Sequence, residues 1–465
     1  MIEKKEGSSK TKTAKTNSRD IFETLPVPQA VRTMALPTIF GQIIVLIYNM
    51  ADTFFVGRTN DPYMVAAASL ILPVFNICLA LAGIGIGAGA LISRLLGEGR
   101  EREAKKVSAF GFYTSILITG IFSASVFVFM KPLLTLLGAS SDTFLYARQY
   151  AFCVIVLGGI PTVLSNVLSN LLRSAGVSRE AGIGVIMGGL INIALDPLFM
   201  FVILPRGNEV LGVGIATLIS NCIACIYFLC IIFKNRKQSV ISFSLKNGLP
   251  EMKSIGAVFN VGVPSAIATL LFDIDYIVID KLMAGYGDVA LAAVGIVLKA
   301  ERLPLNVGIG ICQGMMPIVA YNFSAKNQER MNATIRFSLK IGLIVSVISI
   351  ILYEIFSGFI LRVFISDAQT VLLGTGFLRI RCLATPLMFM SFFTVHVFQG
   401  FGSGNTSLFL GIMRWAVFNI PMLFLLNSIF GMYGIVWSQV SADVLTVLLS
   451  AAVYYRYTKK MNSGI

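Results

Sequence analysis

The sequence is short of charged side chains and contains one histidine. Only 13% of its 465 residues are charged, whereas 56% are hydrophobic, more than a water-soluble globular domain can bury. The histidine, His396, has no cysteine cluster in a polar setting to work with, because all seven cysteines lie in apolar segments. A metal centre or a histidine-based hydrolytic centre lacks the side chains it needs. We therefore expect no enzyme, no catalytic residue, no cofactor and no metal beyond a coupling ion.

Long polar stretches are equally scarce. Apolar stretches of about 20 residues, enough to cross the ~30 Å hydrocarbon core of a bilayer, recur from Met34 to Tyr454 with short polar breaks. They are too long and too uniformly apolar for the strands of a membrane barrel, whereas a helix pairs its backbone amides within one segment. The sequence predicts an all-α membrane protein with twelve transmembrane helices in two six-helix, pseudo-symmetric lobes.

The formal net charge of +14 indicates membrane topology and not nucleic-acid binding. Lysine and arginine gather in the N-terminal tail and in alternate loops, while the loops between them are sparser and more acidic. The basic clusters are 94–106, 173–179, 234–253, 326–340 and 456–460. The positive-inside rule then predicts a multi-pass protein of the cell membrane with both termini in the cytoplasm.

A polar segment, 234–255, divides the spans into six and six. We expect an N-terminal lobe at 34–233 and a C-terminal lobe at 256–456, preceded by a disordered cytoplasmic tail, 1–33, and followed by a cytoplasmic C-terminus, 457–465. The lobes resemble each other at a nearly fixed offset of 220 to 225 residues, since Gly83-Ile-Gly-Ile recurs as Gly308-Ile-Gly-Ile and Ile160-Pro161 aligns with Thr385-Pro386. Six spans per repeat predict parallel repeats around a central cavity.

Ionisable residues at membrane depth are candidates for function, because each is costly there unless paired or hydrated. In the first half they are Asp52 and Asp196, and Asn192 lies one helical turn before Asp196 on the same face. The expected spans place Thr217 at a similar depth. These four residues predict a cation-coupling site for H⁺ or Na⁺ in the outer half of one lobe. The alternative is that Asp52 and Asp196 cap helix ends near the interface.

The second half has more such residues, and the candidates there are Asp273, Asp275, Asp280, Lys299, Glu301 and Arg302. Asp273 and Asp280 share a helix face, whereas Asp275 points about 200° away. Asp275 and Lys299 reach comparable depths on antiparallel spans. Two readings stay open, a buried ion pair between them or a role in substrate or ion movement.

At these positions the sequence resembles the multidrug and toxic compound extrusion (MATE) family, over the chain from about Leu36 to Tyr454. The matching segments follow in order through both halves: Leu36-Pro37, Tyr48 to Gly57, Gly97 to Arg100, Leu171 to Gly176, Asn192 to Pro197, Gly212 to Thr217 and Gly434 to Trp437. Each segment is short, and their order and spacing across two repeats carry the resemblance.

The resemblance implies a V-shaped antiporter that exports cationic, lipophilic drugs in exchange for inward H⁺ or Na⁺ by alternating access. The family's cation site in the N-terminal lobe corresponds to Asp52, Asn192, Asp196 and Thr217. One branch of the family has a further acidic residue in the tenth helix, whereas residues 379–398 hold no carboxylate and only His396. The pattern is nearer to the DinF-like or MepA-like bacterial members. The expected partners are small organic cations and the lipid bilayer, not nucleic acid, and we expect a monomer.

Three other functions compete with this interpretation. A lipid-linked oligosaccharide flippase of the same superfamily needs a strongly cationic cavity, to which Arg302, Lys299 and Arg381 would contribute, although acidic residues offset them. A membrane-embedded enzyme lacks a catalytic triad or a metal set. A channel fits less well, because paired repeats with interrupted helices favour alternating access.

Overall fold

The computed structural model describes residues 19–59, 61–236, 239–244, 246 and 248–462. Residues 1–18 of the predicted tail, parts of the predicted linker and residues 463–465 lie outside the described residues. The helices of the first half are α2 (Val27–Gly57), α3 (Pro62–Ala80), α4 (Gly83–Gly97), α5 (Glu101–Val128), α6 (Met130–Leu136), α7 (Ser141–Ala151), α8 (Gly159–Ser174), α9 (Ser178–Leu198) and α10 (Glu209–Lys234). Those of the second half are α11 (Met252–Ala284), α12 (Asp288–Ser324), α13 (Gln328–Phe364), α14 (Ala368–Cys382), α15 (Thr385–Phe401), α16 (Gly404–Ile412), α17 (Ile420–Phe430) and α18 (Met432–Asn462).

The predicted twelve spans are present in this part of the chain. Ten stretches are long and apolar enough to cross a membrane, and two bent pairs of helices complete the set. The first pair joins 141–157 to α8 at 44°, and the second joins α14 to α15 at 46°. Each bend lies beside the matched prolines, Pro161 and Pro386, and a proline removes a backbone donor from the helix ladder. The fourth span of each half is therefore bent at the same place in the repeat.

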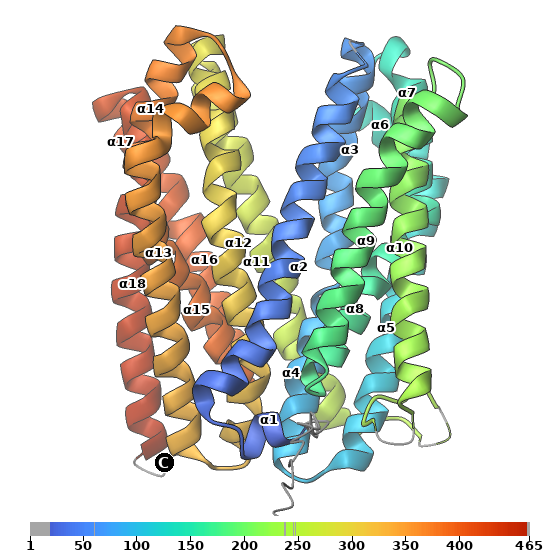
Figure 1. Cartoon of the computed structure of the whole chain (residues 1–465), viewed down its shortest axis with the longest axis vertical. Coiled ribbons are helices and arrows are strands. Elements are labelled where there is room, and N and C mark those ends of the chain that lie inside the picture. The colour runs from blue at the N-terminus through green and yellow to red at the C-terminus, as the bar shows by residue number, and fades with distance from the viewer. Residues whose placement is uncertain (1–18, 60, 237–238, 245, 247, 463–465) are drawn as a thin grey trace, which may run out of the picture.

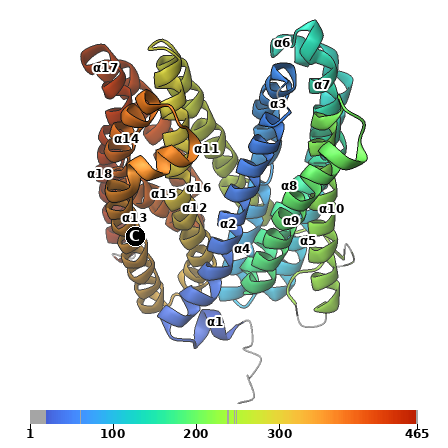
Figure 2. The same cartoon turned by 45° about the horizontal axis from the view of Figure 1, so that its top comes forward.

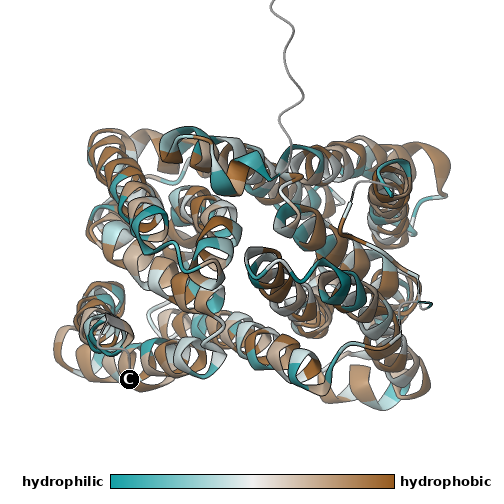
Figure 3. Ribbon diagram, turned by 90° about the horizontal axis from the view of Figure 1, so that it is seen from below, coloured by the Kyte–Doolittle hydropathy of each residue, from teal (hydrophilic) through white to brown (hydrophobic). Residues whose placement is uncertain are grey.

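The two halves form two groups of helices that spread apart at one end and meet at the other (Figure 1, Figure 2). Both ends of the described chain lie at the end where the groups meet, which we call the joined end. From that end the groups stand side by side, with apolar residues over much of their outer faces (Figure 3). Large apolar side chains exposed in this way suit a hydrocarbon solvent. The two-lobed fold predicted from the sequence is confirmed.

The predicted disordered tail, 1–33, is wrong for its second half. A short helix, α1 (Asp20–Glu23), precedes α2, which begins at Val27 instead of 34. Phe22 is 1% exposed, and its ring stacks on that of Tyr321 in α12 at 5.1 Å between centroids. The low aromatic content of the tail as a whole hid this one anchoring side chain. Boundaries elsewhere shift less: α11 begins at Met252, and α18 continues to Asn462.

Close helix contact at the joined end depends on a small residue in α12. A Cβ atom added at Gly314 would lie 2.5 Å from the Cα atom of Ala35 in α2, closer than two carbon atoms can approach. Glycine there lets the first span of one half rest against the second span of the other. The lobes therefore meet backbone to backbone.

We expect Gly314→Ala to lower the melting temperature of the purified protein, because the methyl group must push α2 and α12 apart at a cost of about 1–3 kcal/mol. Gly295, in the same helix, has open space around its Cα atom. Gly295→Ala is the control and gains roughly 1 kcal/mol of helix propensity. Thermal unfolding of both variants in the same detergent checks this, and equal melting temperatures would contradict the contact.

Candidate functional site

The first site lies where α2 and α9 pack together. Gly189 in α9 admits the side chains of α2, since a Cβ atom there would lie 2.4 Å from Ile44 Cγ2. About two turns further along both helices, the carboxyl groups of Asp52 and Asp196 lie within hydrogen-bonding reach of each other. Asp196 is fully buried and Asp52 half-buried. The two carboxylates that the sequence singled out are therefore neighbours.

An amide and a hydroxyl complete this cluster. Asn192 Nδ2 donates to Thr217 Oγ1 of α10 at 3.4 Å, and Asn192 and Thr217 are 2% and 7% exposed. All four predicted residues are thus brought together. Asp52 and Asp196 lie inside their helices and not at the N-terminal caps. The capping alternative is therefore excluded.

The oxygen atoms of this cluster lack donors. Among the described residues, no hydrogen bond reaches Asp52 Oδ1, either carboxyl oxygen of Asp196, or Asn192 Oδ1, although all are buried. Buried acceptors without partners are costly, and two adjacent carboxylates repel each other. A proton or a small cation relieves both costs. Carboxylate and amide oxygens are also the ligands that hard cations prefer.

Two tyrosines flank the pair, and the sequence reasoning did not single them out. Tyr48, one turn before Asp52 in α2, and Tyr150 of α7 both lie within electrostatic reach of Asp52. The spacing of Tyr48 and Asp52 at i and i+4 was a usable signal, because such residues share a helix face. Nothing in the sequence pointed to Tyr150, which reaches the site from another span.

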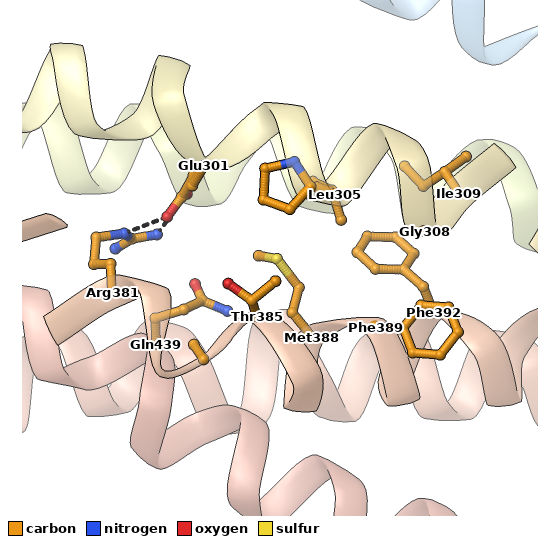
Figure 4. Close-up of a pocket in the computed structure, with 12 residues that line it drawn as sticks. Glu301, Leu305, Gly308, Ile309, Arg381, Thr385, Met388, Phe389, Phe392 and Gln439 are labelled. Carbon is orange, nitrogen blue, oxygen red and sulfur yellow. Dashed lines mark hydrogen bonds and ion pairs between the residues drawn. The ribbon is translucent and has the colours of Figure 1, made fainter. Parts of the chain in front are cut away.

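The second polar group lies inside the C-terminal lobe and consists of paired charges. Arg381 of α14 binds Glu301 of α12 through two contacts, 2.6 Å from Nε and 2.8 Å from Nη2. Tyr276 of α11 donates to the same carboxylate at 2.9 Å. Figure 4 shows this ion pair at one end of a pocket that is otherwise lined mainly by apolar side chains, with Thr385 and Gln439 beside it. Glu301 is therefore neutralised within the lobe.

Of the two open readings for Asp275 and Lys299, the ion pair between them is wrong. Asp275 is buried and accepts a hydrogen bond from Asn419 Nδ2 at 2.6 Å, whereas Lys299 is exposed. The depths match, but Lys299 lies two residues before Glu301, so it points about 200° away from that inward-facing side chain. Depth alone could not reveal this, because it does not specify the helix face.

The remaining C-terminal candidates are less enclosed. Asp273 is half-buried and Asp280 exposed, on the face opposite Asp275, as the spacing predicted. The guanidinium of Arg302 lies 4.9 Å from the ring centroid of Tyr276, an attractive cation–π arrangement. His396 faces the carbonyl of Phe392 in its own helix at 2.8 Å. Arg302 lies within electrostatic reach of both Asp273 and Asp280, and Lys299 within reach of Asp280. These four candidates therefore form a charged group separate from Asp275 and Glu301.

A second buried ion pair was missed by the sequence reasoning. Arg414 contacts Asp443 of α18 at 2.9 and 3.4 Å, and Gln439 donates to the same carboxylate at 2.7 Å. Both charged residues lie within apolar spans. They could therefore have been found, as Asp275 was, by looking for ionisable residues at membrane depth. Among the described residues, the C-terminal lobe therefore contains two buried ion pairs.

Breaking one of these pairs is expected to destabilise the lobe. Arg381→Gln leaves Glu301 buried without its charged partner, which costs about 3–5 kcal/mol. Glu301→Gln leaves the Arg381 charge uncompensated, and the double variant recovers part of the loss. Lys299→Gln is the control, because its exposed ammonium has no part in the pair. Thermal unfolding in detergent measures all four variants, and a loss in the control as large as in Arg381→Gln would count against the pairing.

Two lobes of six spans related by an internal repeat, with unpartnered carboxylates at membrane depth, define a multi-pass membrane transporter. The comparisons with known proteins agree. The MatE family model matches residues 37–198 and 264–425, which is more than half of the chain. The chain belongs to the MatE family, and the resemblance seen in the sequence is confirmed.

Relatives and solved structures extend this finding over the whole length. The chain is 30% identical over 436 residues to the multidrug export protein MepA of Staphylococcus aureus (strain MSSA476), covering 93% of this chain and 95% of the relative. It is 29% identical to MepA of Staphylococcus haemolyticus, covering 95% and 96%. A solved outward-facing multidrug resistance MATE family transporter superimposes with a TM-score of 0.88 at 21% identity, covering 96% and 99%. That structure establishes the likeness of fold.

Proposed function

We propose that this protein exports cationic, lipophilic compounds in exchange for H⁺ or Na⁺ by alternating access. The relatives named multidrug export protein support the substrate class. The observation that carries the coupling is the pair Asp52 and Asp196, whose buried oxygens have no donor among the described residues. Such a site can take up and release a proton or Na⁺ without any other charged side chain having to move. The coupling residues are Asp52, Asn192, Asp196 and Thr217.

The orientation follows from the distribution of charge. The basic clusters, such as Arg94 to Lys106 and Arg456 to Lys460, flank the joined end of the lobes (Figure 1). The positive-inside rule assigns that end to the cytoplasm, with both termini. The spread end then faces outward, and the carboxylate pair takes up its ion from outside. When the lobes rock, the pair releases the ion inward and the substrate cation moves the other way.

The basic side chains that the flippase alternative requires do not line a common cavity. Arg381 is neutralised by Glu301, and Arg302 lies against the ring of Tyr276. Lys299 is exposed and lies within electrostatic reach of Asp280. These three cations therefore do not form the cationic cavity that a pyrophosphate group requires.

Asp52→Asn and Asp196→Asn should each abolish export driven by an ion gradient, because asparagine keeps the shape but cannot exchange a proton or balance Na⁺. Uphill export in proteoliposomes, with pH and Na⁺ gradients imposed separately, measures the loss and identifies the ion. Asp280→Asn is the matched control, since it removes an exposed carboxylate from the other lobe. Near wild-type uphill export by both N-lobe variants would refute the assignment.

The N-terminal segment holds the joined end closed in the proposed cycle. Arg330 of α13 donates to the carbonyl oxygens of Phe22 at 2.7 Å and Ile21 at 3.0 Å, which fixes α1 on the C-terminal lobe. From there Arg19 forms an ion pair with Glu101 at the start of α5, in the N-terminal lobe. The segment therefore bridges both lobes. Opening the joined end requires this bridge to release.

A second bridge runs in the opposite direction. Glu103 of α5 accepts hydrogen bonds from Glu251 N at 2.7 Å and Ser254 Oγ at 2.9 Å, both at the start of α11. Arg100 pairs with the Glu251 side chain at 2.7 Å. At the cytoplasmic edge, α1 of the first half thus contacts the C-terminal lobe, and the start of α11 of the second half contacts the N-terminal lobe. The contacts of Glu103, which is buried, contribute more than the exposed pair of Arg100 and Glu251.

Phe22→Ala should loosen the joined end, because it removes a fully buried ring that anchors α1, at a local cost of about 3 kcal/mol. Hydrogen–deuterium exchange should become faster in residues 20–35 and 97–107. Phe54→Ala is the control: it lies in α2 but is 59% exposed. If hydrogen–deuterium exchange in these two segments stayed at the wild-type rate in Phe22→Ala, α1 would not hold the joined end closed.

A further inference from the structure

A cavity on the outer side of the C-terminal lobe belongs to neither polar site. It has a volume of about 180 Å³ and is lined by Ile335 and Leu339 of α13, by residues of α15 between Met390 and Val397, and by residues of α18 between Val447 and Tyr454. Ala451, in the lining, is exposed at the protein surface, so the cavity opens between α13 and α18, both of which pack against α15 and are neighbours in Figure 1. An apolar cavity of about 150 Å³ is large enough to bind benzene. This one accommodates a segment of hydrocarbon chain.

Basic side chains surround the cytoplasmic end of this cavity. Arg336 and Lys340 are exposed and directly follow the lining residues Ile335 and Leu339. Arg336 also lies within electrostatic reach of Tyr454, which lines the cavity from α18. Arg456 and Lys459 are exposed beyond it. The three segments that form the walls, 330–353, 385–401 and 444–462, contain no aspartate or glutamate. The exposed Glu329 lies one residue before the first of these segments, so the mouth of the cavity is predominantly positive.

We propose that this cavity binds an anionic phospholipid of the cytoplasmic leaflet. One acyl chain fills the cavity between α13 and α18, and the phosphate group lies against Arg336 and Lys340. Both side chains have long apolar stems that reach from the hydrocarbon region to the headgroup level. Basic pockets between spanning helices on the cytoplasmic side are suited to anionic headgroups. Tyr454 lies at the depth where aromatic side chains meet the membrane interface.

The positive charge at the mouth favours an anionic lipid over a lipophilic cation, a zwitterionic lipid or an apolar compound. A lipophilic cation, which is the proposed substrate, is repelled by four basic side chains without an acidic partner in these walls. A zwitterionic lipid gains little, because its own cation offsets the phosphate. An apolar compound would fill the cavity but would leave the charges unused. An anionic lipid is the one occupant that matches both the wall and the mouth.

Native mass spectrometry of the full-length protein tests the proposal with phosphatidylglycerol and phosphatidylcholine of identical acyl chains. We expect one phosphatidylglycerol to be retained at a concentration about tenfold lower than phosphatidylcholine. The double variant Arg336→Gln/Lys340→Gln should lose this preference. Ala451→Phe, which places a ring in the mouth at a lipid-exposed position, should reduce retention of both lipids. Lys234→Gln/Lys253→Gln removes the same charge from the same end, away from the cavity, and should behave as the wild type.

Three outcomes would overturn the assignment. Equal retention of the two lipids would exclude recognition of the headgroup. Unchanged preference in Arg336→Gln/Lys340→Gln, or an equal loss in Lys234→Gln/Lys253→Gln, would show that net charge and not this site attracts the lipid. Displacement of bound phosphatidylglycerol by tetraphenylphosphonium in the wild type, but not in Ala451→Phe, would assign the cavity to a cationic substrate. Because Ala451 faces lipid, its substitution leaves the folded core intact and keeps the test decisive.

Discussion

Hydrocarbon offers a buried charge no water, so each ionisable group inside the bilayer must find its partner within the protein or exchange it with the solvent. This constraint divides the two lobes. In the C-terminal lobe, Glu301 and Asp443 each have an arginine, and Asp275 has the amide of Asn419. In the N-terminal lobe, Asp52 and Asp196 have each other. Asp275 Oδ2 also lacks a hydrogen-bond partner among the described residues. What distinguishes the N-terminal pair is that two buried carboxylates lie side by side with no ion pair to a basic residue in the described part of the chain.

The same backbone repeat therefore carries two kinds of chemistry. The bend in the fourth span recurs at Pro161 and Pro386, and the first span of each half rests on the second span of the other. Internal ion pairs such as Arg381 with Glu301 hold their helices in one arrangement, because separating them would leave a buried charge alone. The C-terminal lobe is accordingly suited to move as a rigid body. The N-terminal lobe contains the group whose charge changes during the proposed cycle.

The sequence predicted the features that depend on one helix at a time. Span number, the division at 234–255 and the depth of Asp52 and Asp196 follow from apolar length and from 1.5 Å per residue. Features that need the relative rotation of two helices were beyond it. Lys299 had the right depth for Asp275 but the wrong face, and the partners Arg414 and Asp443 come from spans that the depth argument never compared. Phe22 was missed for a related reason, because its partner Tyr321 lies 299 residues along the chain.

The joined end shows how the two lobes depend on each other. Its contacts combine a backbone approach at Gly314, which is selective for shape, with charged bridges at Arg19 and Glu103, which can exchange their partners for water. If the joined end were held by close packing alone, opening it would break all of the apolar contact at once. If it were held by exposed charges alone, the two lobes would be joined too weakly. With both present, the closed end has a defined geometry and a release route through solvent. A proton or Na⁺ bound between Asp52 and Asp196 then needs to shift this balance by only a few kcal/mol to change which end is open.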